Sequence, residues 1–165
     1  MINLGSIRAL LAYNDWADGR LLEASAGLAD EALDRAFDMG MGTLRRTLIH
    51  TWAGESVWLA RWMGKSETKW PDEAERLAVA EIQKRFGAVW VERSRFLASL
   101  QDGDLTREQV YRDSRGSLFR ATLGNMLIQG VTHSMHHRAQ AVNMLRRLDA
   151  GVVELDYMMW VRRPA

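Results

Sequence analysis

Residues 122–148, TLGNMLIQGVTHSMHHRAQAVNMLRRL, decide the fold of this chain. Apolar residues recur there at spacings of three and four, which is the period of an α-helix and not the alternation of a strand. Thr122 is a suitable N-cap, and Gly151 stands just beyond the last apolar residue. At about 100° per residue, the side chains expected in the core form one stripe: Leu123, Leu127, Gly130, Ser134, Ala141, Leu145 and Leu148. The stretch therefore predicts one long helix with a buried face.

Three further segments have the same period, and the sequence predicts helices over about 4–26, 42–63 and 72–100. Residues 101–120 differ, because apolar pairs flank an Asp-Ser-Arg-Gly turn there. That pattern predicts a small hairpin or an extended loop before the last long helix. A short closing helix is expected over 155–161.

The simplest fold for four long amphipathic helices is an all-α four-helix bundle, because each apolar stripe must be buried against another helix. With 165 residues, the chain is long enough to bury roughly 70% of the surface that it exposes when unfolded. No repeat, linker or low-complexity tract separates one part of the chain from another. We therefore expect a single domain over 1–165.

Charge and composition exclude several classes of partner. The 22 basic and 21 acidic side chains nearly balance and form no long run of either sign, so the chain offers no electrostatic footprint for nucleic acid. No stretch approaches the roughly 18 uninterrupted apolar residues that a membrane-spanning helix requires, and the first residues do not resemble a signal peptide. We expect a cytoplasmic protein that binds neither nucleic acid nor membrane.

The histidines suggest a metal site. His133 and His137 are four residues apart on one flank of the long helix, so their rings can bind one ion. His136 points roughly a third of a turn further round, toward the outside, although a His133/His136 pair is an alternative. His50, on the helix predicted over 42–63, could complete the set across the bundle. Taken alone, His50 is better explained as a hydrogen-bonded core histidine, but together with the pair it favours a metal.

Two further residues are candidates for the same site. Glu55 lies within the apolar stripe of the helix that carries His50, so it should either meet a cation or orient a histidine. It is also a candidate general base, and Gln140 is a candidate hydrogen-bond donor to a substrate. Gly130, one turn before His133, would leave room for an ion or a ligand.

The ligand set limits the kind of metal centre. The chain has no cysteine, so its ligands must be His, Asp, Glu and water. It has neither an H-E-x-x-H motif nor the paired E-x-x-H motifs of a di-iron bundle, so a mononuclear site fits better than a dinuclear one. Three imidazoles and an open position suit a divalent ion, with zinc and nickel as leading candidates and iron or manganese as alternatives.

Three motifs resemble those of the DinB-like (DinB/YfiT) superfamily of metalloenzymes, over nearly the full length of the chain. Residues 13–22, YNDWADGRLL, are similar to the opening Y-N-x-W-A-N-x-x-L of that family. Residues 48–62, LIHTWAGESVWLARW, are similar to its H-x-x-x-x-E-x-x-W-L-x-R, and residues 133–148 to its H-x-x-x-H-R-G-Q. Asp18 replaces the usual Asn, and Ala139 a usual Gly, but no ligand is lost.

The resemblance implies a four-helix bundle of mirror-type topology that holds a divalent ion through His50, His133 and His137. It also implies a homodimer and a small-molecule substrate. The chemistry implied is thiol-dependent, an S-transfer or isomerisation that uses a low-molecular-weight thiol such as bacillithiol, mycothiol or glutathione. A metal-dependent hydrolase and a non-enzymatic, stress-associated metal-binding dimer remain alternatives.

Overall fold

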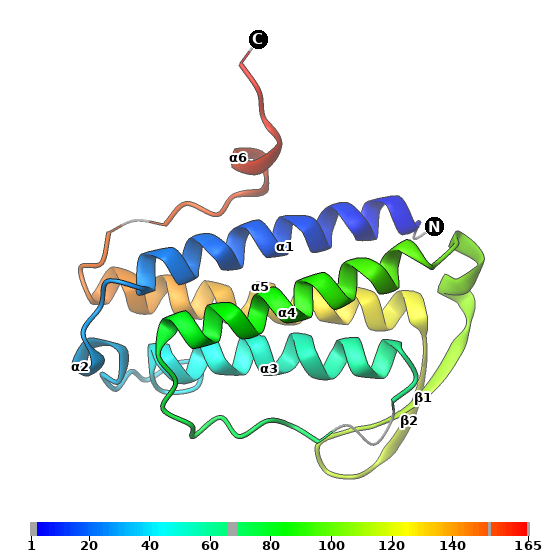
Figure 1. Ribbon diagram of the computed structural model, residues 1–165, viewed down its shortest axis with the longest axis horizontal. Helices are drawn as coiled ribbons and strands as arrows, with labels where there is room; N and C mark the ends of the chain where they lie inside the picture. Colours follow the sequence, from blue (N-terminus) through cyan, green and yellow to red (C-terminus); the bar gives the residue numbers. More distant parts are fainter. Residues whose placement is uncertain (1–2, 66–68, 152, 165) are drawn as a thin grey trace.

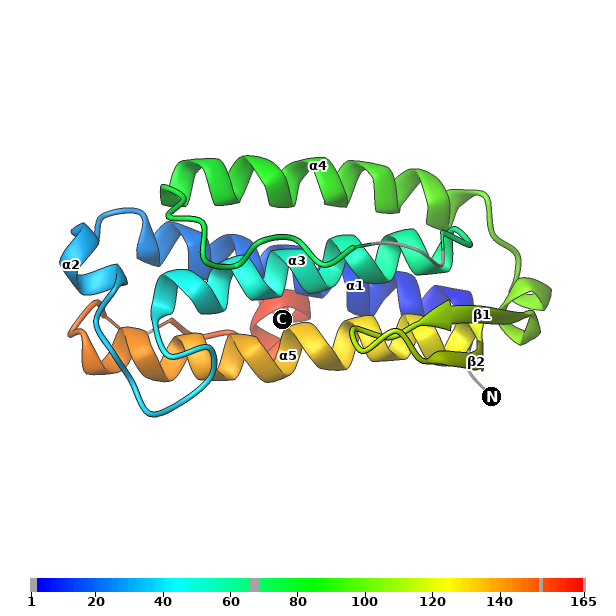
Figure 2. The same cartoon turned by 90° about the horizontal axis from the view of Figure 1, so that it is seen from below.

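The computed structural model describes residues 3–65, 69–151 and 153–164. Its long helices are α1 (Leu4–Ser25), α3 (Leu44–Trp62), α4 (Val79–Ala98) and α5 (Leu123–Arg147), and they lie side by side (Figures 1 and 2). The shorter elements are α2 (Asp30–Leu33), η1 (Asp102–Thr106), β1 (Glu108–Arg112), β2 (Leu118–Thr122) and α6 (Tyr157–Val161). The predicted all-α four-helix bundle is therefore confirmed.

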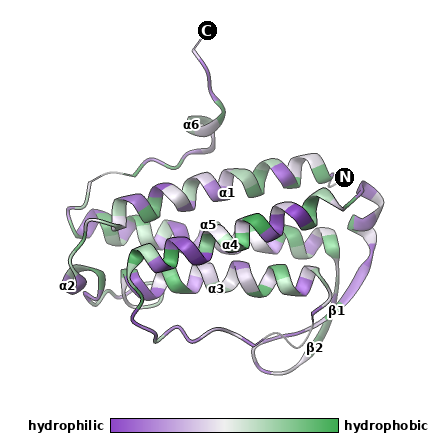
Figure 3. Ribbon diagram, viewed as in Figure 1, coloured by the Kyte–Doolittle hydropathy of each residue, from purple (hydrophilic) through white to green (hydrophobic). Residues whose placement is uncertain are grey.

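The helices form a four-sided bundle. Helix α1 packs against α4 and α5, and α3 packs against the same two helices. Consecutive long helices α1 and α3 are thus at diagonal positions (Figure 1). In Figure 3 each long helix carries both hydrophobic and hydrophilic residues along its length, as one buried and one solvated side require.

Side chains cap three of the long helices. Asn3, Thr43 and Thr122 accept hydrogen bonds from backbone amides three residues further on, at 2.8, 3.2 and 3.4 Å. Each bond satisfies one of the amides that have no partner within the helix. The sequence-based expectation that Thr122 caps α5 is correct, and α3 begins two residues later than expected.

The largest departure from the sequence-based helices lies between α3 and α4. A helix was expected from residue 72, but α4 begins at Val79, and residues 69–78 form an irregular connection. The carboxylate of Asp72 accepts from the backbone amide of Ala74 at 2.9 Å, which makes a local turn instead of a helix cap.

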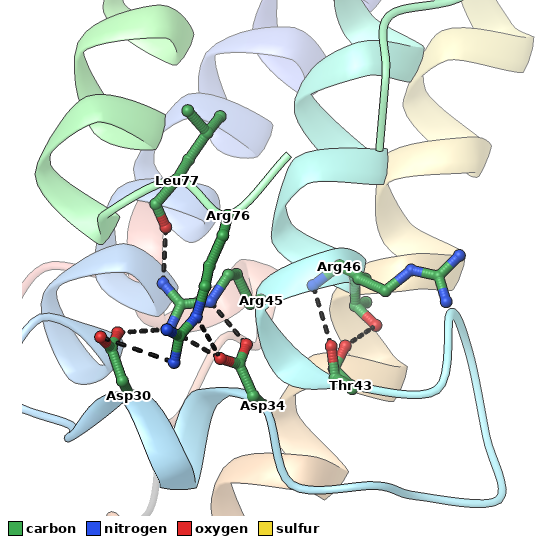
Figure 4. A network of polar contacts seen from close by, with 8 residues as sticks. Asp30, Asp34, Thr43, Arg45, Arg46, Arg76 and Leu77 are labelled. Atoms are coloured by element: carbon green, nitrogen blue, oxygen red, sulfur yellow. Dashed lines mark hydrogen bonds and ion pairs between the residues drawn. The ribbon is translucent and has the colours of Figure 1, made fainter. Parts of the chain in front are cut away.

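Arg45, near the start of α3, fixes the end of that connection. Its guanidinium is buried and donates to Asp30 at 2.5 Å, to Asp34 at 2.6 Å and to the backbone oxygen of Leu77 at 2.6 Å (Figure 4). Arg76 adds a further bond to Asp34 at 2.9 Å. The network ties the short α2, which the sequence did not predict, to α3 and to the connection.

The sequence predicted either a small hairpin or an extended loop before α5, and the structure has the hairpin. Strands β1 and β2 pair antiparallel, with Val110 opposite Arg120. Gln109 donates to the backbone oxygen of Trp62 at 2.9 Å, and Arg61 donates to that of Arg112 at 2.8 Å. The hairpin is therefore fastened to the end of α3.

Helix α6 lies outside the bundle, beyond α1 (Figure 1). The hydroxyl of Tyr13 on α1 donates to the backbone oxygen of Leu155, and its ring lies 5.2 Å from that of Tyr157. Among the described helices, none is long and apolar enough to cross a membrane.

Candidate metal centre

Three histidine rings meet between α3 and α5. His50 comes from α3, and His133 and His137 come from α5, which packs against it. The ring centroids are 5.2 Å apart for His50 and His133, and His137 lies 4.3 and 4.6 Å from these two. One nitrogen of each ring lies within 4.8 Å of the others. A single ion bound at roughly 2 Å from each nitrogen would draw the three ligand atoms closer together than this.

Two of the rings are held by a hydrogen bond at Nδ1. Nδ1 of His50 donates to Oε1 of Glu73 at 2.5 Å, and Nδ1 of His137 donates to Oε1 of Gln140 at 2.8 Å. Because Nδ1 carries the proton in both contacts, Nε2 keeps its lone pair. Both rings therefore present Nε2 as a ligand atom.

His133 has a ring nitrogen without a hydrogen-bond partner among the described residues. This nitrogen is Nδ1, and it is buried. A buried polar nitrogen without a partner is costly. Desolvation, with smaller effects of His137 and His50, lowers the pKa of His133 to about 3, and burial also lowers the pKa of His137. These two rings are neutral at pH 7, which is the form that binds a metal.

Gly54 on α3 makes the approach of His133 possible. A β-carbon at Gly54 would lie 2.3 Å from Cε1 and 2.7 Å from Nδ1 of His133, closer than carbon and nitrogen can approach. The expectation that Gly130 leaves room for an ion is wrong, because the indole of Trp62 fills that space, 2.5 Å from where a β-carbon of Gly130 would be.

The irregular connection 69–78 supplies two residues beside the rings. Trp70 lies with its ring centroid 5.2 Å from that of His50 and 6.4 Å from that of His133. Its Nε1 donates to the same oxygen of Glu73 that receives the proton of His50. Trp70 and Glu73 were not found from the sequence, where the residues from 72 onward were assigned to a helix.

Glu55 meets a cation, which was the first of the two expectations for it. Its Oε2 accepts from Arg93 at 2.8 Å and from Trp90 at 3.2 Å, and its Oε1 accepts from Ser134 at 3.1 Å. Desolvation, and then the charge of Asp18, raise the pKa of Glu55 to about 8. None of its hydrogen bonds within the described ranges involves a histidine, so its role as general base stays a prediction.

Glu55 belongs to a buried polar layer that spans the bundle. On its far side, Arg138 of α5 donates to Asp18 at 3.1 Å and to Asn14 at 3.0 Å, both on α1. Arg93 of α4 also bonds Asp15 of α1. The layer thus joins all four long helices.

Gln140 lies beside the cluster, but its amide is engaged. Its oxygen accepts from His137, and its Nε2 donates to Nε2 of His136 at 3.0 Å. His136 itself is exposed and is not part of the three-ring cluster. The role of Gln140 as a donor to substrate stays a prediction, and its observed contacts are those of a residue that orients His137.

A comparison of the whole sequence with known families gives one match. The profile of the DinB family matches residues 1–162. This chain belongs to the DinB family. No curated protein sequence matches the DinB chain.

Three solved structures share the fold of this DinB protein. A DinB-like protein from Bacillus cereus superposes with a TM-score of 0.74 at 21% identity, over 92% of this chain and 97% of the other. A DinB family member from Shewanella denitrificans gives 0.67 at 18%, over 99% and 100%. YfiT from Bacillus subtilis, described as a probable metal-dependent hydrolase with an unusual four-helix bundle topology, gives 0.62 at 19%, over 90% and 91%.

The donor set of this DinB protein fits a divalent transition metal. Three imidazole nitrogens from two packed helices converge, two have their second nitrogen satisfied, and the third has a buried nitrogen without a partner. Nitrogen ligands of this kind suit zinc, nickel, iron or manganese better than calcium or magnesium, which prefer oxygen.

Proposed function

We propose that this DinB protein is a metal-dependent enzyme in which His50, His133 and His137 hold one divalent ion and activate a nucleophile for attack on a small molecule. The observation that carries the proposal is the convergence of the three ring nitrogens within 4.8 Å. Zinc or nickel is the ion that we expect, with iron and manganese as alternatives. A bound ion of this kind acts as a Lewis acid and lowers the pKa of a water or a thiol, so that it is a nucleophile at neutral pH.

The residues of the chain hold the site ready for this chemistry. Glu73 and Gln140 keep the protons of His50 and His137 at Nδ1, so that both rings face inward with Nε2. Burial keeps His133 neutral. Trp70 covers His50 and His133 on one side, which limits the access of water.

The nucleophile that we propose is a low-molecular-weight thiol such as bacillithiol, mycothiol or glutathione, used for S-transfer or isomerisation. In S-transfer, the sulfur forms a bond to an electrophilic carbon, the bond from that carbon to its leaving group breaks, and the thiol proton passes to solvent. These thiols are reduced in the cytoplasm, which is where the proposal places the protein.

Hydrolysis is the second candidate, and one observation favours it. The structural neighbour YfiT from Bacillus subtilis is described as a probable metal-dependent hydrolase. In that reaction water replaces the thiol, and the acyl–oxygen bond of an ester breaks while water supplies the new oxygen and a proton to the leaving alcohol.

One experiment tests the proposal and separates the two reactions. Protein purified without a histidine tag is analysed for bound metal, loaded with zinc or nickel, and incubated with chlorodinitrobenzene or nitrophenyl acetate, with and without each thiol. Thioether formed faster than in the mixture of thiol and electrophile without protein supports the transferase, and nitrophenol released without thiol faster than in buffer alone supports the hydrolase. If neither appears while the metal raises the melting temperature, the protein is a non-enzymatic metal-binding protein and the proposal fails.

We also propose that the protein is a homodimer. Four large apolar side chains of α6 are at least 36% exposed in the single chain, Tyr157, Met158, Met159 and Val161. Exposed apolar side chains grouped on one short element commonly mark an interface. Light scattering after size exclusion tests this, and a monomer at all concentrations would contradict it.

A further inference from the structure

A small pocket lies where the hairpin meets the α3–α5 pair. It has a volume of about 270 Å³ and lies between α3, α5 and the hairpin. Its walls are formed by Trp58, Tyr111, Ala121, Asn125, Met126 and Gln129. None of these six is charged, so the pocket offers apolar surface and amide groups but no ion-pair partner.

The helices place this pocket one turn away from the histidines. On α5, Gln129 precedes His133 by four residues, which is about 6 Å along the axis and about 40° around it. On α3, Trp58 follows Gly54 by four residues, and Gly54 touches the ring of His133. The pocket and the candidate metal centre are therefore neighbouring parts of one face of the α3–α5 pair. Figure 2 shows the hairpin beside the first turns of α5.

Trp58 and Tyr111 form an aromatic wall of the pocket, and Arg61 contacts both rings. The rings of Trp58 and Tyr111 lie 5.6 Å apart at an angle of 58°. The guanidinium of Arg61 lies 4.7 Å from the first ring centroid and 5.2 Å from the second, and it donates to the backbone oxygen of Arg112. Cation–π contacts of this kind fix both rings before a ligand arrives.

The opposite side of the pocket is polar and accessible. Asn125 and Gln129 are exposed residues of α5, one turn apart, and both line the pocket. Their amides can donate to, or accept from, a carbonyl, nitro or hydroxyl substituent. A flat ring that packs against the aromatic wall would bring such a substituent to the amides.

We propose that this pocket binds a planar, uncharged aromatic or conjugated group of the substrate, whose electrophilic carbon then reaches the three histidines one helical turn away. The inference rests on the proposed function and specifies its substrate class. Charged aromatic acids and small aliphatic electrophiles are excluded from this class. Arg61, the cation beside the pocket, stacks on the two rings and donates to the backbone oxygen of Arg112, and it is not among the lining residues. Recognition therefore depends on a ring face and not on an ion pair.

Binding to metal-free protein tests the pocket independently of catalysis. Benzamide is the probe, with benzoate as the charged and acetamide as the ring-free comparison, and the readout is NMR shifts of the Asn125 and Gln129 side-chain amides and the Trp58 indole. We expect saturable shifts of these signals with benzamide and none with the other two compounds. Equal binding of benzoate or acetamide, or no saturable shift, would overturn the inference.

Variants locate the binding to these residues. Trp58→Leu and Gln129→Ala should each weaken benzamide binding about fivefold or more. Gln83→Ala, which changes an exposed glutamine on α4, should leave it unchanged. Circular dichroism melting of Gln129→Ala guards against loss of fold, and unchanged affinity in that folded variant would contradict the assignment. If benzamide binds but neither reaction occurs, the pocket stands and the proposed activity fails.

Discussion

The ring of His133 rests directly on the backbone of Gly54, so that a β-carbon there would come within 2.3 Å of the imidazole. The contact lies within the candidate metal centre and joins α3 to α5, the two helices that carry the candidate ligands. The position of His133 therefore depends on the absence of a side chain from α3.

Replacing Gly54 by Ala should displace His133 and weaken metal binding. We expect metal affinity to fall by about tenfold or more and the free energy of unfolding of the metal-free protein to fall by about 1–3 kcal/mol. Competition with a chromophoric chelator measures the first quantity, and urea unfolding the second. Gly87→Ala on α4 is the matched control, because nothing lies within 4 Å of its added β-carbon. Unchanged affinity in Gly54→Ala would show that His133 is not a ligand in this position.

Removing Glu73 should loosen His50 without removing a ligand. In Glu73→Ala, Nδ1 of His50 loses its acceptor, and we expect metal affinity to fall by about 10- to 100-fold, as is usual when the partner of a ligating histidine is removed. Nitrogen NMR of His50 should show that its proton no longer stays on Nδ1. Glu75→Ala, which changes an exposed residue of the same connection that pairs with Arg85, should retain full affinity. A similar loss in both variants would point to a general effect on the connection.

The three clustered histidines should behave differently from the fourth. His50→Ala, His133→Ala and His137→Ala should each abolish stoichiometric metal binding, because each removes one of three converging nitrogens. His136→Ala should largely preserve it, since that ring is exposed and its hydrogen bond and ring contact within the described residues are with Gln140 and His137 of the same helix. Elemental analysis after desalting measures the stoichiometry. Equal loss in all four variants would place the ion elsewhere.

The buried carboxyl of Glu55 should make stability depend on pH. Burial raises its pKa from 4.5 to about 8 in the folded protein, so between these values the folded chain holds a proton that the unfolded chain releases. The contribution of Glu55 to stability is therefore present below about pH 4.5 and is lost as the pH rises through about 8.

Comparison with Glu55→Gln isolates this effect, because the amide cannot titrate. From pH 5 to pH 8, the free energy of unfolding of the wild type should fall by about 3–4 kcal/mol relative to that of Glu55→Gln. Urea unfolding of metal-free protein at each pH gives the difference. A difference that is constant with pH would mean that Arg93 keeps Glu55 ionised throughout.

The bundle and the grouping of the histidines could be predicted because both depend on helical period. Residues four apart share a face, so the sequence alone placed His133 and His137 together and His136 outside. The buried character of the helix around His50 then made that residue the partner from across the bundle. The structure brings the three rings together, and their role as ligands is the proposal that the metal analysis tests.

The residues that orient the histidines or make room for them could not be predicted from helical period. Glu73 lies in a connection without any period, 23 residues from the histidine that it orients. Gly54 and Gly130 look alike in sequence, since each stands about one helical turn from a candidate ligand, His50 for the first and His133 for the second. Only the packing of α3 on α5 shows that the first faces a histidine and the second faces Trp62.

The hydrogen bond between Ser134 and Glu55 has a consequence for the alignment of α3 and α5. Ser134 adjoins His133, and Glu55 lies five residues beyond His50, so this bond fixes how far one helix can slide along the other. Arg93 holds the same carboxyl group from α4, and a shift by one turn would leave buried polar groups without partners. The helical register of the metal centre is thus enforced by residues that touch no ligand, and this layer can be disrupted with every imidazole still in the chain.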